Sequence, residues 1–506
     1  MFSSYFGYVV KQKVLLIGLG PHCKRIYIAG LKRFDLSPAL IIDIESKRRD
    51  VEAFVRERGL ASELFFIPDE ERDATVLSDY VQSNLDRLIV SHQISHAIIS
   101  TEPKAHYAYL QYLIIKQIPT LTDKPITSPV DVINNEEQAR KISAEYHHLL
   151  SLAESYNTPV VVQCQRRYDP RYRWIIDRVG TLIHEYALPV SHIHITHCDG
   201  SLNMPDEFFS RENHPYKYGY GKLFHSGYHF IDLANLLLSY DQLSPEKRPS
   251  DCLVTSSHYS PHDQLFALDE SFYLRAFKQG GYSTFYDLWR NQKYLNMGEL
   301  DMLALFEFSR GSQVVTTCSL NLLQSGFTRR AWTHLPIDNY KGNGRVRHET
   351  LSLQMGPLMN IQVHSYQAYE IKERNNQSID HQAPGGLEHF DIHIFRNSDI
   401  IGGLPHEIVK GSDLFPKQIE SSNHFIGYNE YARAECLSDF LNGREGRSNL
   451  QAQMLTIDMV TNAYISMCRK RRGEAPVSKF KLTNQNLIEE HSYGKSELCS
   501  GIYCRS

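Results

Sequence analysis

Two glycines near the N-terminus stand where a chain can hold a phosphate group. Gly18 and Gly20 follow a short apolar run, Val14 to Ile17, and a helical pattern comes directly after them. A glycine pair between a strand and a helix allows a tight turn, and backbone N–H groups and the helix dipole can then approach an anion. Cys23 stands where a third glycine or alanine usually permits close packing of the helix on the strand. The residues therefore predict an incomplete dinucleotide-binding turn.

Other residues near this turn also fit a dinucleotide. Pro21 and His22 open the helix, so we expect them beside the phosphates. Asp43 ends a second apolar strand, where a carboxylate can accept hydrogen bonds from ribose hydroxyls. A basic run at 47–49 could instead bind a ribose 2′-phosphate, although such a run is more often a solvated surface. NAD is favoured over NADP, but the choice stays open.

A second group, near the middle of the chain, has acid–base chemistry. His225, His229 and Asp232 are spaced i, i+4 and i+7, which places them on one face of a helix. Histidine has the side-chain pKa nearest neutrality, so His229 can act as a general base on a hydroxyl group. The spacing could also suit a metal, but Ser226 occupies the position where a zinc protease carries glutamate. We expect no metal.

The elements that must position these residues fall into two regions. Up to about residue 165, short apolar runs alternate with amphipathic stretches, a pattern typical of βαβ units and a doubly wound parallel sheet. We expect strands at 14–17, 39–43, 97–100 and 160–162, with helices at 104–116 and 137–156. The N-terminal region, 1–165, is thus predicted to be a Rossmann dinucleotide-binding domain.

The pattern changes beyond residue 166 to longer strands with period-2 alternation, which favours an open, mostly antiparallel sheet. We expect strands at 191–196, 303–308, 314–320, 351–354 and 361–364, and a buried helix at 454–467. Three stretches rich in turn-forming residues are expected to be loops or insertions: 240–261, 333–344 and 373–386. The predicted organisation is an α+β domain at 166–475 with insertions and closing helices, followed by a tail at 476–506.

Composition excludes several classes of function. The 506 residues carry a net charge of −4, so no cationic excess is available for nucleic acid. No apolar run reaches the roughly 18 residues that cross a bilayer, and the first ten residues lack a signal-peptide pattern. The nine cysteines are scattered without a CxxC pair, which argues against a disulfide framework. We expect a cytoplasmic protein with neither a nucleic-acid partner nor a membrane partner.

Five short motifs, in this order and spacing, resemble those of the Gfo/Idh/MocA family of oxidoreductases, named for glucose-fructose oxidoreductase, inositol dehydrogenase and a rhizopine-catabolism protein. The motifs are Gly18-Leu-Gly20, Thr101-Glu-Pro103-Lys-Ala-His106, Asp123-Lys124-Pro125, Arg166-Arg167-Tyr168-Asp-Pro170 and the stretch from Gly219 to Asp232. The resemblance implies a Rossmann domain followed by an α+β domain, with the substrate between them over a nicotinamide. It also implies that Thr101, Pro103, His106, Lys124 and Pro125 contact the cofactor.

Roles for single residues follow from the same resemblance. Lys124 corresponds to the family's lysine beside the nicotinamide and the reacting hydroxyl, with Asp123 in place of the usual glutamate. His229 matches the family's catalytic histidine, whereas His225 stands where an aspartate is usual and cannot supply a permanent negative charge. We therefore expect Lys124, His229 and His225 to be catalytic. Arg167, Tyr168 and Asp232 join the two histidines as expected substrate-binding residues, with an interdomain salt bridge as the alternative for Arg167.

Three functions remain in competition. The first is an NAD(P)-dependent dehydrogenase or reductase acting on a secondary alcohol or ketone of a sugar, a polyol or a sugar derivative. The second is an NAD-dependent glycosidase of the same fold, which regenerates its cofactor at every turnover. The third is a non-catalytic regulator that responds to a nucleotide, because a fold alone does not fix function. The expected partner is a sugar-like small molecule, and the resemblance implies a homo-oligomer, either a dimer or a tetramer.

Overall fold

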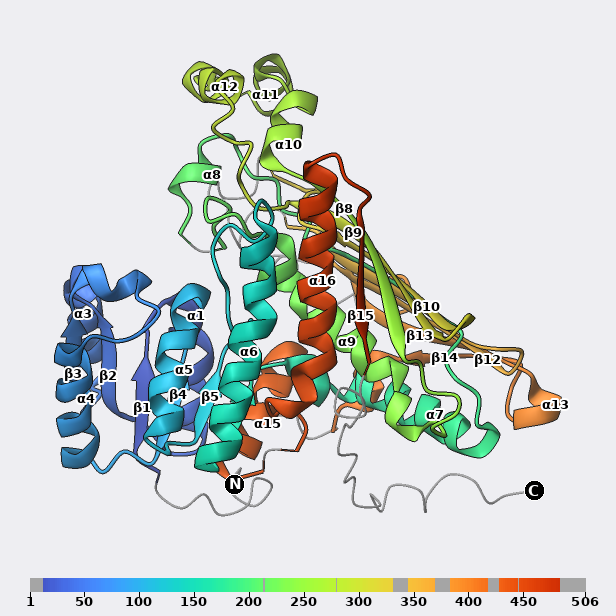
Figure 1. The fold of residues 1–506 in the computed structure, drawn as a ribbon, viewed down its shortest axis with the longest axis horizontal. Coiled ribbons are helices and arrows are strands. Elements are labelled where there is room, and N and C mark those ends of the chain that lie inside the picture. The colour runs from blue at the N-terminus through green and yellow to red at the C-terminus, as the bar shows by residue number, and fades with distance from the viewer. Residues whose placement is uncertain are drawn as a thin grey trace.

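The computed structural model describes residues 12–212, 214–278, 280–330, 345–368, 383–416, 427–444 and 446–482. Over these residues the chain forms two β-sheets with helices packed around and between them (Figure 1). One sheet belongs to the N-terminal region, and the other is built from the middle and the end of the chain. This is the combination that the sequence predicts.

The N-terminal sheet has six parallel strands in the order β3-β2-β1-β4-β5-β6. Its strands are β1 Val14–Ile17, β2 Pro38–Ile44, β3 Glu63–Ile67, β4 His96–Ile99, β5 Thr120–Thr122 and β6 Val160–Val162. Strands covered on both faces read as continuous apolar runs, and all four residues of β1 are buried. The prediction of a doubly wound parallel sheet is confirmed, and its order is that of the dinucleotide-binding folds.

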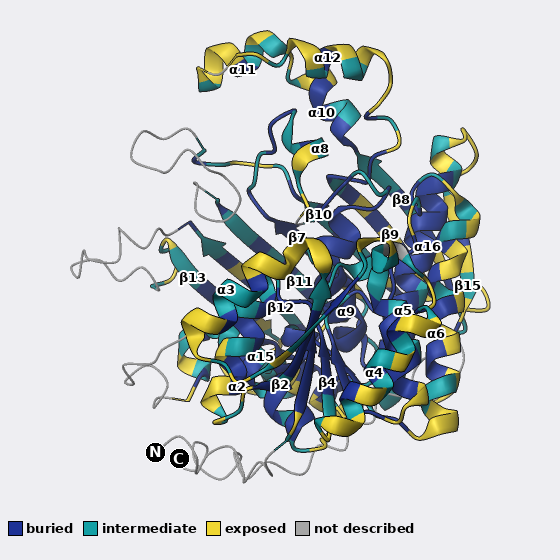
Figure 2. Cartoon of the chain, turned by 90° about the vertical axis from the view of Figure 1, so that its left-hand side faces the viewer, coloured by how far each residue is buried: buried dark blue, intermediate teal, exposed yellow. Residues whose placement is uncertain are grey.

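Helices cover both faces of this sheet (Figure 2). They are α1 Pro21–Cys23, α2 Ala29–Arg33, α3 Arg48–Arg58, α4 Asp79–Ser91, α5 His106–Ile115 and α6 Glu136–Tyr156. Helix α15, Tyr428–Leu441, comes from much later in the chain, and its Cys436 and Phe440 share a core with Val14 and Leu16. A late segment of the sequence therefore completes one face of the N-terminal sheet.

The second sheet has nine strands in the order β14-β13-β12-β11-β7-β10-β9-β8-β15. Their bounds are β7 His192–Cys198, β8 Asp251–Tyr259, β9 Asp301–Arg310, β10 Gln313–Leu323, β11 Arg347–Met355, β12 Met359–Gln367, β13 Glu388–Arg396, β14 His406–Lys410 and β15 Val477–Lys481. Only the β7–β10 pair among these is parallel. The expected mostly antiparallel sheet is confirmed.

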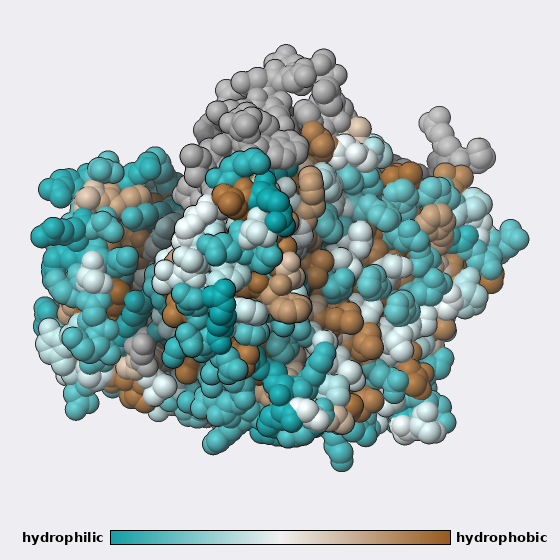
Figure 3. All heavy atoms as spheres, turned by 90° about the horizontal axis from the view of Figure 1, so that it is seen from above, coloured by the Kyte–Doolittle hydropathy of each residue, from teal (hydrophilic) through white to brown (hydrophobic). Residues whose placement is uncertain are grey.

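Three long helices pack against this sheet and join its core to that of the first: α7 Pro170–Tyr186, α9 Tyr228–Leu238 and α16 Met454–Arg471. Every residue of α9 is buried. One face of the sheet remains open, since β9 alternates buried Phe306 and Phe308 with Leu303 and Leu305, which are about half exposed. Seen from above, apolar side chains are scattered among polar ones (Figure 3).

The expected loop at 240–261 is wrong, because it contains β8. Cys252 and Val254 are buried while Leu253 between them is exposed, so the three apolar residues do not reveal the strand alternation by type alone. After β8, three short helices with an aromatic core of their own form a projection: α10 Pro261–Ala267, α11 Glu270–Phe277 and α12 Ser283–Arg290. Two further short helices are α8 Glu207–Ser210 and α13 Ser398–Ile401.

The remaining expectations on loops and ends have mixed outcomes. The stretch 333–344 and most of 373–386 lie outside the described residues. Residues 477–481, in the segment expected to be a tail, form the edge strand β15, which pairs with β8. Among the helices of the described residues, none combines the length and the apolar character needed to cross a membrane.

Candidate active site

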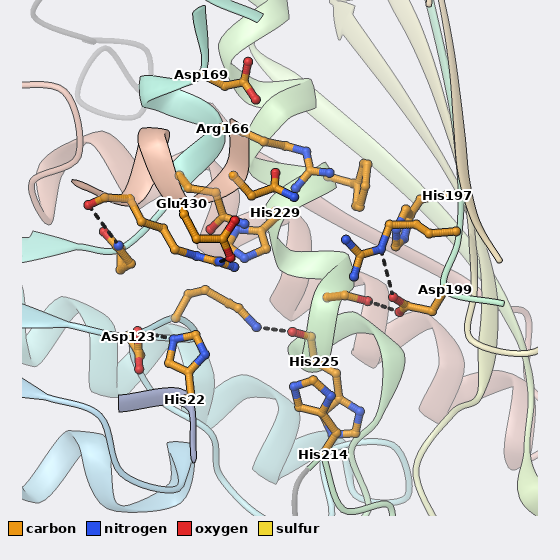
Figure 4. A pocket seen from close by; sticks show the side chains of 18 of the residues that line it. His22, Asp123, Arg166, Asp169, His197, Asp199, His214, His225, His229 and Glu430 are labelled. Carbon is orange, nitrogen blue, oxygen red and sulfur yellow. Dashed lines mark hydrogen bonds and ion pairs between the residues drawn. The ribbon is translucent and has the colours of Figure 1, made fainter. Parts of the chain in front are cut away.

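A cavity of about 550 Å³ lies between the two sheets, lined by side chains from both. Figure 4 shows His22 and Asp123 on one side of it, His197 and Asp199 on the other, and His229 between them. Of the residues that the sequence singled out for a site, those that line the cavity are His22, Thr101, Pro103, His106, Lys124, His225 and His229. Apart from His22, which follows the glycine motif, these residues belong to three of the five motifs, and Arg166 of a fourth motif also lines the cavity. Gly18, Gly20, Pro21 and Asp43 do not line it.

The glycine turn after β1 has the geometry that a bound phosphate requires. Gly18 has a φ of +87°, and a Cβ there would lie 2.7 Å from the carbonyl oxygen of Ser100, so only glycine fits without strain. At Gly20 a Cβ would meet nothing within 4 Å among the described residues, so the space in front of the turn is open. Asp43 Oδ2 accepts a hydrogen bond from Leu19 N at 2.8 Å and thus ties the turn to β2.

The helix after the turn begins without a side-chain cap. Gly20 is its N-cap and has no side chain to cap the helix, and Pro21 is its first residue. Such an N-terminus favours negative charge through its unpaired N–H groups and its dipole. Cys23 is buried at the glycine position of the motif, and the helix continues through a π-helical turn, Lys24–Ile28. The turn and helix fit a pyrophosphate, although the glycine motif is incomplete.

Asp123 is held as a carboxylate beneath this turn. It accepts hydrogen bonds from Tyr27 Oη at 2.5 Å and from Ser100 Oγ at 2.8 Å, and His22 Nε2 lies 3.6 Å away. Burial by itself would raise the pKa of Asp123, but His22 and the two hydroxyl donors outweigh burial and hold the pKa below its usual range. Asp123, which stands where the resembled family has a glutamate, is therefore a charged carboxylate held by Tyr27, Ser100 and His22.

Lys124 reaches from the end of β5 to the helix that carries both histidines. Its Nζ donates hydrogen bonds to the backbone carbonyl of His225 and, at 3.3 Å, to that of Phe224. Burial lowers the pKa of Lys124 to about 8, even though Asp123 acts in the opposite direction. A lysine with that pKa can both donate and accept a proton near neutrality.

His106 lines the cavity, and its ring contacts two of the loops near Lys124. Its Nδ1 donates to the carbonyl of Pro125 at 2.8 Å, and its Nε2 lies 3.3 Å from the carbonyl of Thr101. Burial lowers the pKa of His106, so the ring is neutral. His106 therefore joins two motif segments, and Pro125 itself does not line the cavity.

His225 and His229 both line the cavity. His225 lies in a π-helical turn, Leu223–Gly227, and His229 lies in α9, which follows it. The His225 ring stacks on His214 at 4.8 Å between centroids and meets the edge of Tyr216 at 5.2 Å. His229 Nδ1 is buried without a hydrogen-bond partner among the described residues. Burial first, and then the nearby Lys124, lowers the pKa of both rings well below the usual value. Both histidines are therefore neutral at physiological pH.

Three expected substrate ligands lie outside the cavity. Arg167 and Asp232 are almost fully buried, with Arg167 Nη2 and Asp232 Oδ1 2.7 Å apart. Arg167 also donates to the carbonyls of Arg447 and Ala452 at 2.9 Å. Tyr168 is buried in the core on the other face of the first sheet. We therefore do not retain these three as substrate ligands, since they do not line the cavity. Arg167 does form a salt bridge, but both of its residues belong to the region 166–475, so it is not the interdomain pair given as the alternative.

Sequence reasoning missed a charged group on the second sheet, where β7 and β11 lie side by side. His197 and Asp199, at the end of β7, line the cavity together with Arg345, Arg347 and Glu349, at the start of β11. A signal was present, because Glu349 stands in phase with the buried Leu351 and Leu353 of the same strand. A charged residue in phase with core residues marks a buried polar site.

Ion pairs and hydrogen bonds connect this charged group to the helix of the histidines. Asp199 Oδ2 accepts hydrogen bonds from Lys222 Nζ at 2.7 Å and from Ser226 Oγ at 2.6 Å, and Ser226 directly follows His225.

Glu102 is a further carboxyl group that lines the cavity, on the side of the first sheet. Burial raises its pKa to about 7. Among the described residues, no group of three or more His, Cys, Asp or Glu side chains is arranged to hold a metal ion.

Comparisons with known proteins agree with this arrangement at the level of fold. No family model and no curated protein sequence matches the chain. An oxidoreductase from Agrobacterium radiobacter in complex with NAD+, L-tartaric acid and magnesium is 13% identical, and the match covers 93% of this chain and 98% of that chain with a TM-score of 0.53. An aldose-aldose oxidoreductase from Caulobacter crescentus, complexed with glycerol, is 13% identical, with coverages of 94% and 100% and a TM-score of 0.52.

A third solved structure, the WlbA dehydrogenase from Bordetella pertussis in complex with NADH and UDP-GlcNAcA, is 10% identical. That match covers 94% of this chain and 99% of that chain with a TM-score of 0.50. Identities this low establish a shared fold and no more. The resemblance to oxidoreductases of the Gfo/Idh/MocA type is thus confirmed as a resemblance of fold, which extends over more than nine tenths of the chain.

Proposed function

We propose that the protein is an NAD(P)-dependent oxidoreductase that interconverts a secondary alcohol and a ketone on a sugar, a polyol or a sugar derivative. The observation that carries the proposal is the position of Lys124, which lines one cavity with His229 and has a pKa of about 8. A group with that pKa is suited to proton transfer near neutral pH. The nicotinamide and sugar-like ligands named for the matched structures are consistent with this chemistry.

The residues of the first sheet fit a dinucleotide. The open space before Gly20 and the uncapped start of α1 suit a pyrophosphate, and Asp43 stands at the end of β2 for the ribose hydroxyls. Thr101 and Pro103 line the cavity on the same side, where the nicotinamide ring would lie. When bound there, the nicotinamide supplies hydride transfer, the part of the reaction that side chains cannot perform.

Lys124 is our candidate for the proton transfer. An ammonium group has three N–H donors, and the carbonyls of Phe224 and His225 accept from two of them. One donor is then left for the oxygen of the substrate. In alcohol oxidation the neutral amine takes the hydroxyl proton, and in ketone reduction the ammonium group returns it.

His229 is the second acid–base candidate, and His225 shapes the floor of the site. Because the pKa of His229 is far below neutrality, its ring is a neutral partner that accepts a hydrogen bond from a substrate hydroxyl. His225 replaces the aspartate usual in the resembled family, so no carboxylate there raises the basicity of His229. We therefore assign the larger catalytic role to Lys124.

NAD is the preferred cofactor in this proposal. The Asp43 carboxylate would repel the 2′-phosphate of NADP at the end of β2. In the basic run at 47–49, Arg48 pairs with Glu45 at 2.6 Å and with Glu52 at 3.5 Å, so its charge is already balanced. These contacts favour the interpretation that the basic run at 47–49 is a solvated surface and not a phosphate site.

We propose that residues 1–165 bind the cofactor and that residues 166–475 bind the substrate. Because Leu303 and Leu305 are exposed on the open face of the second sheet, we also propose that the protein forms a homo-oligomer, with an apolar surface of β9 at the contact. We also propose the cytoplasm as the compartment of this function.

Turnover on a panel of polyols and sugars, followed by NADH absorbance, tests the proposed function. We expect the wild-type protein to reduce NAD with at least one member of the panel and Lys124→Ala to be far slower. A nucleotide-responsive regulator would bind NADH and show no turnover with any member. A glycosidase would release a sugar from a glycoside without net reduction of NAD.

A further inference from the structure

Several basic side chains gather around Asp199 on the cavity wall of the second sheet. Asp199 faces three cations: Lys222 at 2.7 Å, the guanidinium group of Arg345, and Arg347, whose Nε lies 3.9 Å away. Positive charge gathered around one buried carboxylate is costly unless a second anion shares it. Glu349 and Glu388 line the same wall and share this charge, and a bound anion could add to them.

A fourth cation, Arg166, extends this group toward the open cavity. Its Nη2 pairs with Glu349 at 2.9 Å, whereas its Nε–H is buried and has no hydrogen-bond partner among the described residues. A buried donor left without an acceptor costs about 1–3 kcal/mol. A carboxylate or phosphate oxygen would satisfy this donor, and guanidinium groups bind both anions through two parallel hydrogen bonds.

The basic side chains also affect the pKa values of two groups in this cluster. Burial, followed by Lys222 and Arg347, lowers the pKa of His197 well below its usual value. Burial and the adjacent Arg347 likewise lower the pKa of the Arg345 guanidinium. Burial is the larger cause of both shifts, and the neighbouring cations act in the same direction; a bound anion would offset the part that the cations cause.

This charged group lies next to the proposed reaction centre. The Arg166 guanidinium lies 3.9 Å from the centroid of the Phe230 ring, and the His197 ring stacks on the same ring at 4.1 Å. Phe230 directly follows His229 in α9, so the cationic wall begins one residue from the proposed acid–base histidine (Figure 4). A substrate that contacts His229 can therefore place a second group against the arginines.

We propose that the substrate carries an anionic group, a carboxylate or a phosphate, which Arg166, Arg345 and Arg347 bind in the cavity. This inference rests on the proposed function and narrows its substrate class to sugar acids and sugar phosphates. The cavity volume of about 550 Å³ is in the range for small-molecule sites. Neutral polyols would leave the donor of Arg166 unsatisfied and would bind more weakly.

Calorimetric titration of the full chain tests the inference with four probes: inorganic phosphate, D-glucuronate, D-glucose 6-phosphate and D-glucose. Phosphate binding that Arg347→Gln weakens reports this anion site, because the glycine turn, which could also bind phosphate, is unchanged in that variant. We expect phosphate to bind and at least one sugar anion to bind about tenfold or more tighter than glucose. Glucuronate and glucose 6-phosphate distinguish a carboxylate site from a phosphate site.

Arg347→Gln is the variant of choice, because the Arg347 side chain is 31% exposed and its removal leaves Asp199 paired with Lys222 and Arg345. Arg290→Gln on α12 is the matched control, since that arginine is 63% exposed and far along the chain from the cavity. We expect Arg347→Gln to weaken anion binding about tenfold and Arg290→Gln to leave it unchanged. Unfolding temperatures of both variants exclude a loss caused by misfolding.

Three results would overturn the inference: no binding of any anion, equal affinity for glucose and both sugar anions, or unchanged anion binding in Arg347→Gln. The titrations are made without nicotinamide, and NADH binding is measured separately. Failure of the anion site therefore leaves NADH binding intact, whereas failure of the proposed function abolishes NADH binding and leaves the anion result standing.

Discussion

The Nζ atom of Lys124 lies 3.3 Å from the backbone carbonyl oxygen of Phe224, so a residue at the end of the first sheet is bonded to the helix that carries His225 and His229. This contact joins the proposed cofactor side of the cavity to its proposed substrate side. Any movement of one sheet against the other would change the position of the amine relative to both histidines.

Replacing Lys124 by alanine should lower turnover about 10²- to 10⁴-fold, the usual contribution of a general acid–base group. The affinity for NADH should change much less, because the glycine turn and Asp43 are untouched. Steady-state rates and NADH titrations check both statements. Lys116→Ala, which removes a partly exposed lysine at the end of α5, is the control and should keep wild-type rates. A Lys124→Ala enzyme with near-normal turnover would remove the residue from the mechanism.

The pH profile should follow the pKa of Lys124. Alcohol oxidation needs the neutral amine, so kcat/KM for oxidation should rise as the pH passes about 8 and then level off. Ketone reduction needs the ammonium group, so its kcat/KM should fall over the same range. Rates measured in both directions between pH 6 and pH 10, about two units on either side of the pKa of Lys124, provide the test. Profiles that change only below pH 6.5, near the ordinary histidine pKa, would contradict the assignment.

The two glycines of the turn should fail in different ways when each is replaced by alanine. Gly18→Ala forces a left-handed φ of +87° and a contact of 2.7 Å with Ser100, so we expect a loss of about 1–3 kcal/mol in stability. Gly20→Ala meets nothing within 4 Å among the described residues, so the fold should remain while the new methyl group blocks the pyrophosphate. Unfolding temperatures and NADH affinities separate the two effects. A Gly20→Ala protein that binds NADH as the wild type does would argue against the pyrophosphate site.

Asp232→Ala should unfold the protein more easily and should not act through substrate binding. Removing the aspartate leaves Arg167 charged and buried, which typically costs about 3–5 kcal/mol. Asp287→Ala is the control, because its pair with Arg290 is exposed and should contribute at most about 1 kcal/mol. Urea-unfolding midpoints measure the difference. An Asp232→Ala protein of normal stability with a raised KM would restore the aspartate as a substrate ligand.

The first sheet was predictable because parallel strands covered on both faces leave uninterrupted apolar runs, as in β1 and β6. Strand β8 was missed because Ser256 and His258 interrupt its alternation and a turn-rich stretch precedes it. The position of α15 on the first sheet was also beyond the sequence, since an apolar helix pattern does not say which sheet it covers.

The positions of two site residues were predictable from their motifs: Gly18 lies in a tight turn with a left-handed φ, and Lys124 lines the cavity. The positions were not predictable for Arg345 and Arg347, which belong to no motif and meet Asp199 only through the pairing of β11 with β7. The helical spacing of His225, His229 and Asp232 was misleading as well. A π-helical turn passes through His225, and Asp232 points to Arg167.

NADH binding to the full chain, measured by fluorescence titration, tests the central claim most directly. We predict a dissociation constant below the millimolar range for NADH, weaker binding of NADPH because of Asp43, and loss of binding in Gly20→Ala without loss of folded structure. Failure of both NADH and NADPH to bind at millimolar concentration would contradict the assignment of the protein as a nicotinamide-dependent oxidoreductase.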